Sequence, residues 1–210
     1  MTSRLALAIR SRLPERLRHA FRLGRHLFTT GQPSMAIPLE LLAQCRVCAS
    51  RNELVRNLPK QARVAEVGTY RGSFARHILD ACDPAELHLI DIDVSPLDPA
   101  VAADRRVTVH QGLSDKVLAR FPDDHFDWIY IDGDHSYDGA SRDARMAATK
   151  VKPGGYLVFN DFAHADPYLG AYGVHRAVVE FAVTRGWPFV WFAYEPNALY
   201  DAALQRPTQS

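Results

Sequence analysis

The 210-residue chain predicts an α/β fold built on a doubly wound, mostly parallel sheet of seven strands with an N-terminal helical extension. Two observations predict it. From Arg63 onward, short apolar runs alternate with segments of helical spacing, as in a parallel sheet covered on both faces. Polar residues also follow successive predicted strands, at positions that share one edge of such a sheet. We therefore expect a sheet domain over residues 59–210 and a helical arm and cover over residues 1–58.

Composition narrows the class of protein. Apolar residues make up 47% of the chain and charged residues 23%, which is ordinary for a globular domain. The net charge of +1 gives no general attraction to nucleic acid. Three cysteines do not make a disulfide framework and indicate a reducing compartment. With no secretory signal and no apolar run of membrane-spanning length, we expect a cytoplasmic protein.

The first 28 residues predict a basic amphipathic helix, which Pro14 divides in two. Seven arginines against Glu15 give this segment a net charge of +6, and large apolar residues recur at every fourth position. Three interpretations stay open. The segment packs on the domain or on a second subunit in a homodimer, it contacts an anionic membrane, or it is a mitochondrial-type presequence.

Residues 29–38 contain Gly31, Pro33 and Pro38 and predict a linker. Residues 39–58 resume helical spacing and include Cys45 and Cys48. A structural zinc site needs four ligands, and the chain has no second cysteine pair. We therefore expect ordinary cysteines on a helix face.

The sheet domain is predicted element by element. Its strands are predicted from short apolar runs at 64–67, 87–90, 106–110, 126–131, 156–159, 188–193 and 198–203. Helical spacing follows at 73–79, 137–151 and 173–185. The last two strands are adjacent in sequence and form a closing pair.

The turn after the first strand organises the domain. Glu66-Val-Gly68-Thr-Tyr-Arg-Gly72 leads directly into a helix, whose free N–H groups face any ligand above the turn. Glycines let that ligand approach the backbone closely. The spacing is neither the Gly-x-Gly-x-x-Gly of dinucleotide folds nor that of a P-loop. It predicts a nucleotide cradle of another type.

Polar residues continue at the ends of the later strands, which is the ligand-binding edge of an open α/β sheet. They are Asp91, Ser114, Asp132, Asp134, His135, Asn160 and Asp161. Asp91 and Ser114 also have a plain alternative role as helix caps. Asp138 and Asp143 fall on the early turns of the following helix, where we expect surface acids.

Over residues 60–205 the chain resembles the class I S-adenosylmethionine-dependent methyltransferases, which have a Rossmann-like sheet. Two motifs, Tyr130-Ile-Asp-Gly-Asp-His-Ser-Tyr-Asp-Gly139 and Lys152-Pro-Gly-Gly-Tyr-Leu-Val-Phe-Asn-Asp-Phe162, resemble the small O-methyltransferases of the catechol and macrolide-sugar types. The resemblance implies transfer of the S-adenosylmethionine methyl group to a small hydroxylated acceptor, a metabolite or sugar. An alternative is a hydroxylase-like or non-catalytic cofactor-binding protein that docks through its basic N-terminal helix.

The resemblance also implies roles for individual residues. Those implied to bind the cofactor are Glu66, Gly68, Thr69, Tyr70, Gly72, Ser73, Asp91, Gln111, Gly112, Ser114 and Asp132. Asp132, Asn160 and Asp161 match positions that hold Mg²⁺ in those families, and such a metal would lower the pKa of the acceptor hydroxyl. Asn160 stands where those families usually have a carboxylate, and an amide is a weaker metal ligand. A methyl transfer without metal, as in other relatives of this fold, is therefore an alternative.

A general base is available at Asp134 or His135. His135 has another possible role, which is to hydrogen-bond a carboxylate and shape the loop. The segment 163–172 is rich in aromatic residues, Pro and Gly and, with Phe162, could line the acceptor pocket.

Overall fold

The structure, a computed structural model, describes residues 35–163, 165–166, 170–195 and 199–208. Its main sheet has eight strands in the order β1-β9-β10-β6-β5-β2-β3-β4. The strands are β1 (Arg46–Cys48), β2 (Arg63–Val67), β3 (Glu86–Asp91), β4 (Val107–Gln111), β5 (Phe126–Ile131), β6 (Val151–Phe159), β9 (Phe189–Ala193) and β10 (Asp201–Gln205). Within this sheet β10 alone is antiparallel to its neighbours, so the predicted fold class is confirmed.

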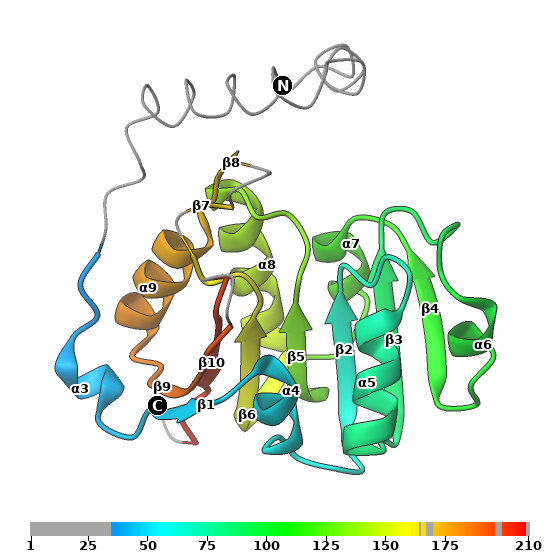
Figure 1. Ribbon diagram of the computed structural model, residues 1–210, viewed down its shortest axis with the longest axis horizontal. Coiled ribbons are helices and arrows are strands. Elements are labelled where there is room, and N and C mark those ends of the chain that lie inside the picture. The colour runs from blue at the N-terminus through cyan, green and yellow to red at the C-terminus, as the bar shows by residue number, and fades with distance from the viewer. Residues whose placement is uncertain (1–34, 164, 167–169, 196–198, 209–210) are drawn as a thin grey trace.

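Helices cover both faces of the sheet (Figure 1). They are α3 (Leu39–Leu42), α4 (Arg51–Arg56), α5 (Ser73–Cys82), α6 (Pro99–Ala102), α7 (Ser114–Leu118), α8 (Tyr137–Lys150) and α9 (Val174–Arg185). Buried residues of α4, α5 and α6 form one core cluster with the sheet, and those of α7, α8 and α9 form another. A separate hairpin, β7 (Ala165–Asp166) and β8 (Gly170–Ala171), lies beyond the carboxyl end of β6.

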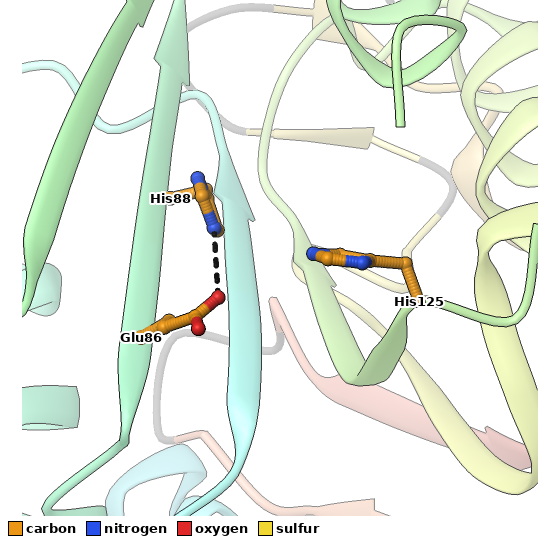
Figure 2. Close-up of side chains that lie close together, drawn as sticks. All are labelled: Glu86, His88 and His125. Atoms are coloured by element: carbon orange, nitrogen blue, oxygen red, sulfur yellow. Dashed lines mark ion pairs between the residues drawn. The ribbon is translucent and has the colours of Figure 1, made fainter. Parts of the chain in front are cut away.

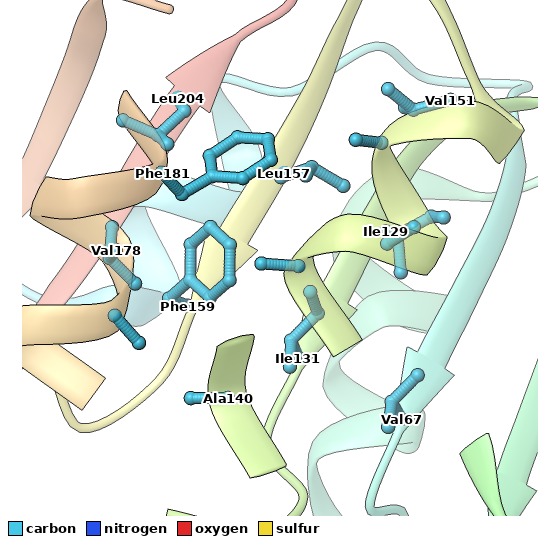
Figure 3. Packing of buried hydrophobic residues seen from close by; sticks show 14 of the residues in the cluster. Val67, Ile129, Ile131, Ala140, Val151, Leu157, Phe159, Val178, Phe181 and Leu204 are labelled. Carbon is cyan, nitrogen blue, oxygen red and sulfur yellow. The ribbon is translucent and has the colours of Figure 1, made fainter. Parts of the chain in front are cut away.

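The central strands are apolar on both sides because both sides are buried. On β5, Trp128 and Tyr130 enter the α4–α5 cluster, whereas Ile129 and Ile131 enter the cluster of α7, α8 and α9. Ile129 lies opposite Leu157 of β6 and Ile131 lies opposite Phe159, and Figure 3 shows these side chains in the core cluster. This packing holds the carboxyl ends of the strands at fixed positions.

The predicted seven-strand sheet and the predicted helix over residues 39–58 are wrong in one respect. Residues 46–48 form β1, which pairs in parallel with β9 and adds an eighth strand at the sheet edge. Cys48 is buried on this strand and Cys45 precedes it, so neither lies on a helix face. A strand of three residues is decided by pairing with a distant neighbour, which local periodicity does not report.

The carboxyl ends of four adjacent strands, β6, β5, β2 and β3, are joined by backbone hydrogen bonds. Gly68 N–H donates to Ile90 O over 2.8 Å, Asp132 N–H donates to Val67 O over 2.8 Å, and Asn160 N–H donates to Ile131 O over 2.9 Å. The loops that leave β2, β5 and β6 therefore begin at one level.

No helix in the described part of the chain is long and apolar enough to cross a membrane. The predicted basic helices of residues 1–28 lie outside the described residues. Their three interpretations stay predictions.

Candidate functional site

The turn after β2 requires glycine at Gly68. Its φ is +86°, and a Cβ there would lie 1.9 Å from the carbonyl oxygen of Asp132. Gly72 caps α5 with φ +76°, and a Cβ there would lie 2.7 Å from the Leu97 side chain. The spacing of these glycines thus serves close packing of the turn against β5 and against the loop after β3.

Asp91, the last residue of β3, fastens this turn. Its Oδ2 accepts a hydrogen bond from Tyr70 N–H over 2.8 Å, and its Oδ1 accepts one from Asp93 N–H over 3.1 Å. Tyr70 has φ +47°, a conformation that is uncommon for a residue other than glycine, and its side chain is exposed. The carboxylate keeps further lone pairs that hydroxyl groups of a ligand can donate to.

A cavity of about 400 Å³ opens between the ends of β2, β3, β4 and β5. It is lined by Val67, Gly68, Tyr70, Ile90, Asp91, Ile92, Gly112, Leu113, Ser114, Asp132, Gly133, Asp134, Arg142 and Asp143. Most of the residues that sequence reasoning assigned to a cofactor lie on this wall. Those that do not are Glu66, Thr69, Gly72, Ser73 and Gln111. Gln111 is exposed, and its side chain donates to Ile92 O.

Glu66 lies beneath the turn rather than on the cavity wall, and only 1% of it is exposed. Thr69 Oγ1 donates to its Oε2 over 2.7 Å. Burial raises the pKa of Glu66 to about 8, while the Thr69 hydroxyl and the charge of Arg51 oppose the rise. The sequence analysis did not predict a role for Arg51, at the start of α4, because residues 39–58 carry no motif.

Asp143 corrects another prediction. It was expected at the surface, yet it is 1% exposed and lines the cavity, where its Oδ1 accepts a hydrogen bond from Ser114 Oγ. Burial raises its pKa. Asp143 lies on the buried face of α8 with Ala140, Ala144 and Ala147, and an interpretation based on charge alone overlooked this spacing. Arg142 also lines the cavity and was not predicted.

His135 lies between two carboxylates at the ends of β5 and β6. Its Nε2 is 3.4 Å from Oδ1 of Asp132 and 3.4 Å from Oδ2 of Asp161. The ring stacks on Tyr172 at 4.6 Å. Burial lowers the pKa of His135, but Asp132, Asp161 and Asn160 outweigh burial and the net shift is upward. The imidazole therefore faces acceptors that stabilise its protonated form.

Asp134, the other predicted base, points elsewhere. Its Oδ1 accepts from Ser136 N–H over 2.9 Å, and its Oδ2 is 3.8 Å from the Arg142 guanidinium. Gly139 gives it room, since a Cβ there would lie 2.3 Å from Asp134 Cγ. Asp134 thus shapes the cavity wall and the start of α8, while His135 joins the carboxylate pair.

Asn160 belongs to a buried network that sequence reasoning did not find. Its Nδ2 donates to Asp201 Oδ1 over 3.0 Å and to Tyr130 OH over 3.3 Å, and Tyr130 OH donates to Asp201 Oδ2 over 2.5 Å. Burial raises the pKa of Asp201 to about 7. Because its amide nitrogen is fixed by Asp201, the carboxamide oxygen of Asn160 is the atom left for His135.

The predicted metal ligands Asp132, Asn160 and Asp161 offer two carboxylates and an amide oxygen, which suit Mg²⁺ in chemistry. In this structure the cationic form of His135 would neutralise the same carboxylates. The donor set therefore fits a divalent cation, and it equally fits a site in which His135 supplies the positive charge.

Two aromatic residues of the expected acceptor pocket are described. Tyr172 stacks on His135, and Phe162 is buried with its ring 4.8 Å from that of His175. His164 and Tyr168, from the same expectation, lie outside the described residues.

Comparison with known proteins agrees with the fold described above. A family model described as a methyltransferase domain matches residues 65–162. A search of curated proteins gave no significant match. The pyocyanin biosynthetic protein PhzM superposes with a TM-score of 0.60 at 16% identity, over 75% of this chain and 54% of that one. The chain thus spans about half the length of PhzM.

Two other solved structures are similar. An O-methyltransferase family protein from Burkholderia thailandensis gives a TM-score of 0.57 at 14% identity, over 76% of this chain and 56% of that one. Aeropyrum pernix fibrillarin with natively bound S-adenosyl-L-methionine gives 0.57 at 16% identity, over 73% of each chain. At these identities the likeness establishes the fold.

Proposed function

We propose that this chain, whose residues 65–162 match a family model described as a methyltransferase domain, transfers the methyl group of S-adenosylmethionine to an oxygen of a small hydroxylated metabolite or sugar. One observation carries the proposal. The cavity between β2 and β5 shares its Asp132 wall with the group formed by Asp132, His135 and Asp161. A nucleotide-sized cavity beside a proton-accepting group is the arrangement that methyl transfer to oxygen requires.

The wall of the cavity matches the chemistry of the cofactor. Asp91 would accept hydrogen bonds from the ribose hydroxyls at the β3 end. Gly112, Leu113 and Ser114 would border the adenine, with apolar contact from Leu113. Gly68 admits the methionine portion close to the backbone, above the buried Glu66 carboxyl. The cationic groups of the cofactor would favour the ionised form of Glu66.

The transfer itself needs little covalent chemistry from the protein. The acceptor oxygen attacks the methyl carbon, the new C–O bond forms as the S–C bond breaks, and the sulfonium charge is neutralised. The hydroxyl proton would pass to the group formed by Asp132, His135 and Asp161, in which the two carboxylates stabilise the protonated imidazole of His135. Positioning of the acceptor in line with the methyl group would supply much of the rate.

A divalent cation such as Mg²⁺, held by Asp132, Asn160 and Asp161, would supply Lewis-acid polarisation of the acceptor hydroxyl. The acceptor would lie beside the ring pair of His135 and Tyr172, which stack at 4.6 Å.

Calorimetric titration with S-adenosylmethionine, followed by transfer assays on a panel of catechols, phenols and sugars, tests the proposal. Asp91→Ala should weaken cofactor binding at least tenfold, because it removes the ribose acceptor and the support of Tyr70 N–H. Asp161→Asn should leave binding within about threefold but abolish turnover. Asn suits the φ of +53° at this position, so the variant should fold. Asp80→Ala, on the exposed side of α5, is the control.

Repeating the assays with MgCl₂ and with EDTA separates the two versions of the mechanism. Loss of turnover in EDTA with intact cofactor binding supports the cation. Equal turnover in EDTA supports proton transfer through His135 alone. If S-adenosylmethionine binds neither with MgCl₂ nor with EDTA, the proposed function is overturned.

A further inference from the structure

A second group of metal-ligating side chains lies at the opposite edge of the sheet from the cavity. Glu86 and His88 are two residues apart on β3 and so face the same side, and His125 immediately precedes β5. One ligand atom from each of these three residues lies within 4.8 Å of the others. Figure 2 shows the His125 ring directed toward the Glu86–His88 pair.

The imidazole of His88 is held in one orientation. Its Nδ1 is 3.0 Å from Nε2 of His110 on β4, and its ring packs edge-on against Phe121 and Phe126. When Nδ1–H donates to His110, Nε2 of His88 carries a lone pair. A metal-bound histidine is oriented by a hydrogen bond from its other ring N–H, usually to a carboxylate, a carbonyl or water, and here His110 is the acceptor.

Nε2 of His88 is buried and has no hydrogen-bond partner among the described residues. It lies 3.6 Å from Oε2 of Glu86, which is too far for a good hydrogen bond. When Nδ1 of His88 carries the proton, the lone pair of Nε2 faces the Glu86 carboxylate, and the two acceptors repel each other. A cation bound between them would remove this repulsion. In the opposite tautomer, Nε2–H points weakly at Glu86 and no cation is needed.

The charges around Glu86, His88 and His125 affect how tightly these residues would bind a metal cation. Burial lowers the pKa of His88, with His110 adding to the effect, and burial followed by the charge of Arg63 lowers the pKa of His125. Both shifts favour the neutral imidazole, which is the form that binds a metal. Arg63 Nε is also 3.5 Å from Oε1 of Glu86, so it competes with any cation at the site.

We propose that Glu86, His88 and His125 form a Zn²⁺ site, with water as the fourth ligand. Two imidazoles and one carboxylate are a zinc ligand set. Tetrahedral zinc places its ligand atoms about 3.4 Å apart, a spacing that Glu86 Oε2 and His88 Nε2 nearly meet at 3.6 Å. The three ligand atoms, which all lie within 4.8 Å of one another, therefore need only a small inward movement to complete the site. Because β2 lies between β3 and β5, the metal would clamp three central strands, far from the cavity.

The test titrates the metal-free full-length protein with ZnSO₄ in the presence of a competing chromophoric chelator, and records visible spectra with Co²⁺. We expect one Zn²⁺ per chain, a higher melting temperature with Zn²⁺, and tetrahedral Co²⁺ absorption. His125→Gln and Glu86→Gln should each weaken binding at least tenfold. His77→Gln, a partly exposed histidine on α5, should not.

Arg63→Gln gives the sharpest outcome, because removal of the competing cation should tighten Zn²⁺ binding. The proposal is overturned if His125→Gln binds Zn²⁺ as the wild type does, or if the folded wild type does not bind it. None of these measurements depends on S-adenosylmethionine, so they stand apart from the test of methyl transfer.

Discussion

Replacing Glu66 by Gln should remove a pH dependence from the stability of the fold. The carboxyl is 1% exposed, and burial raises its pKa from 4.5 to about 8. Between these values the unfolded chain has lost a proton that the folded chain keeps. Stability therefore falls as pH rises through this window. At pH 7 the difference of about 2.5 pH units corresponds to about 3 kcal/mol. Gln resembles the protonated acid in shape and cannot ionise.

Urea denaturation of the wild type and of Glu66→Gln at pH 5, 6, 7 and 8 measures this effect. The difference in the free energy of unfolding should grow in favour of the variant by about 1.4 kcal/mol per pH unit up to pH 7, and by less between pH 7 and pH 8, where folded Glu66 begins to ionise. Glu40→Gln, at an exposed position on α3, should show a flat difference. A difference between wild type and Glu66→Gln that does not change with pH would refute the reasoning.

The same group couples cofactor binding to protons. If S-adenosylmethionine binds with Glu66 ionised, as proposed, the wild-type affinity should rise about tenfold between pH 6 and pH 7, since ionisation below a pKa of about 8 costs about 1.4 kcal/mol per unit. Calorimetry in buffers of different ionisation enthalpy should record proton release that is absent in Glu66→Gln. Proton release of equal size in both proteins would assign it to another group.

Two further predictions concern packing at the site. Gly68→Ala, whose Cβ would lie 1.9 Å from Asp132 O, should cost about 3 kcal/mol or more in urea denaturation, whereas Gly186→Ala, with open space around it, should cost about 1 kcal/mol. Equal costs would contradict the close approach. Asp201→Ala should cost about 3 kcal/mol, because it leaves Tyr130 OH and the Asn160 amide without an acceptor, and Asp201→Asn should cost less. A loss below about 1 kcal/mol for Asp201→Ala would show that water replaces the carboxylate.

The sequence alone determined the order of the sheet elements after Arg63. Continuous apolar strands that alternate with helices have one common architecture, and its carboxyl edge collects the residues at strand ends. Gly68, Asp91, Asp132, His135 and the other strand-end residues were found for this reason. Their position depends on where the strands end, and the local hydrophobic pattern predicts the strands well.

Only the tertiary structure decided what each of these residues contacts. β1 exists because it pairs with β9, where Cys48 lies opposite Ala193, 145 residues away along the chain, and no local signal predicts such a pairing. Asp143 and Asp201 are polar residues inside a core, and their partners come from other elements. Local pattern fixes which residues reach an edge, whereas contacts between distant segments fix which of them share a proton, a carboxylate or a cavity.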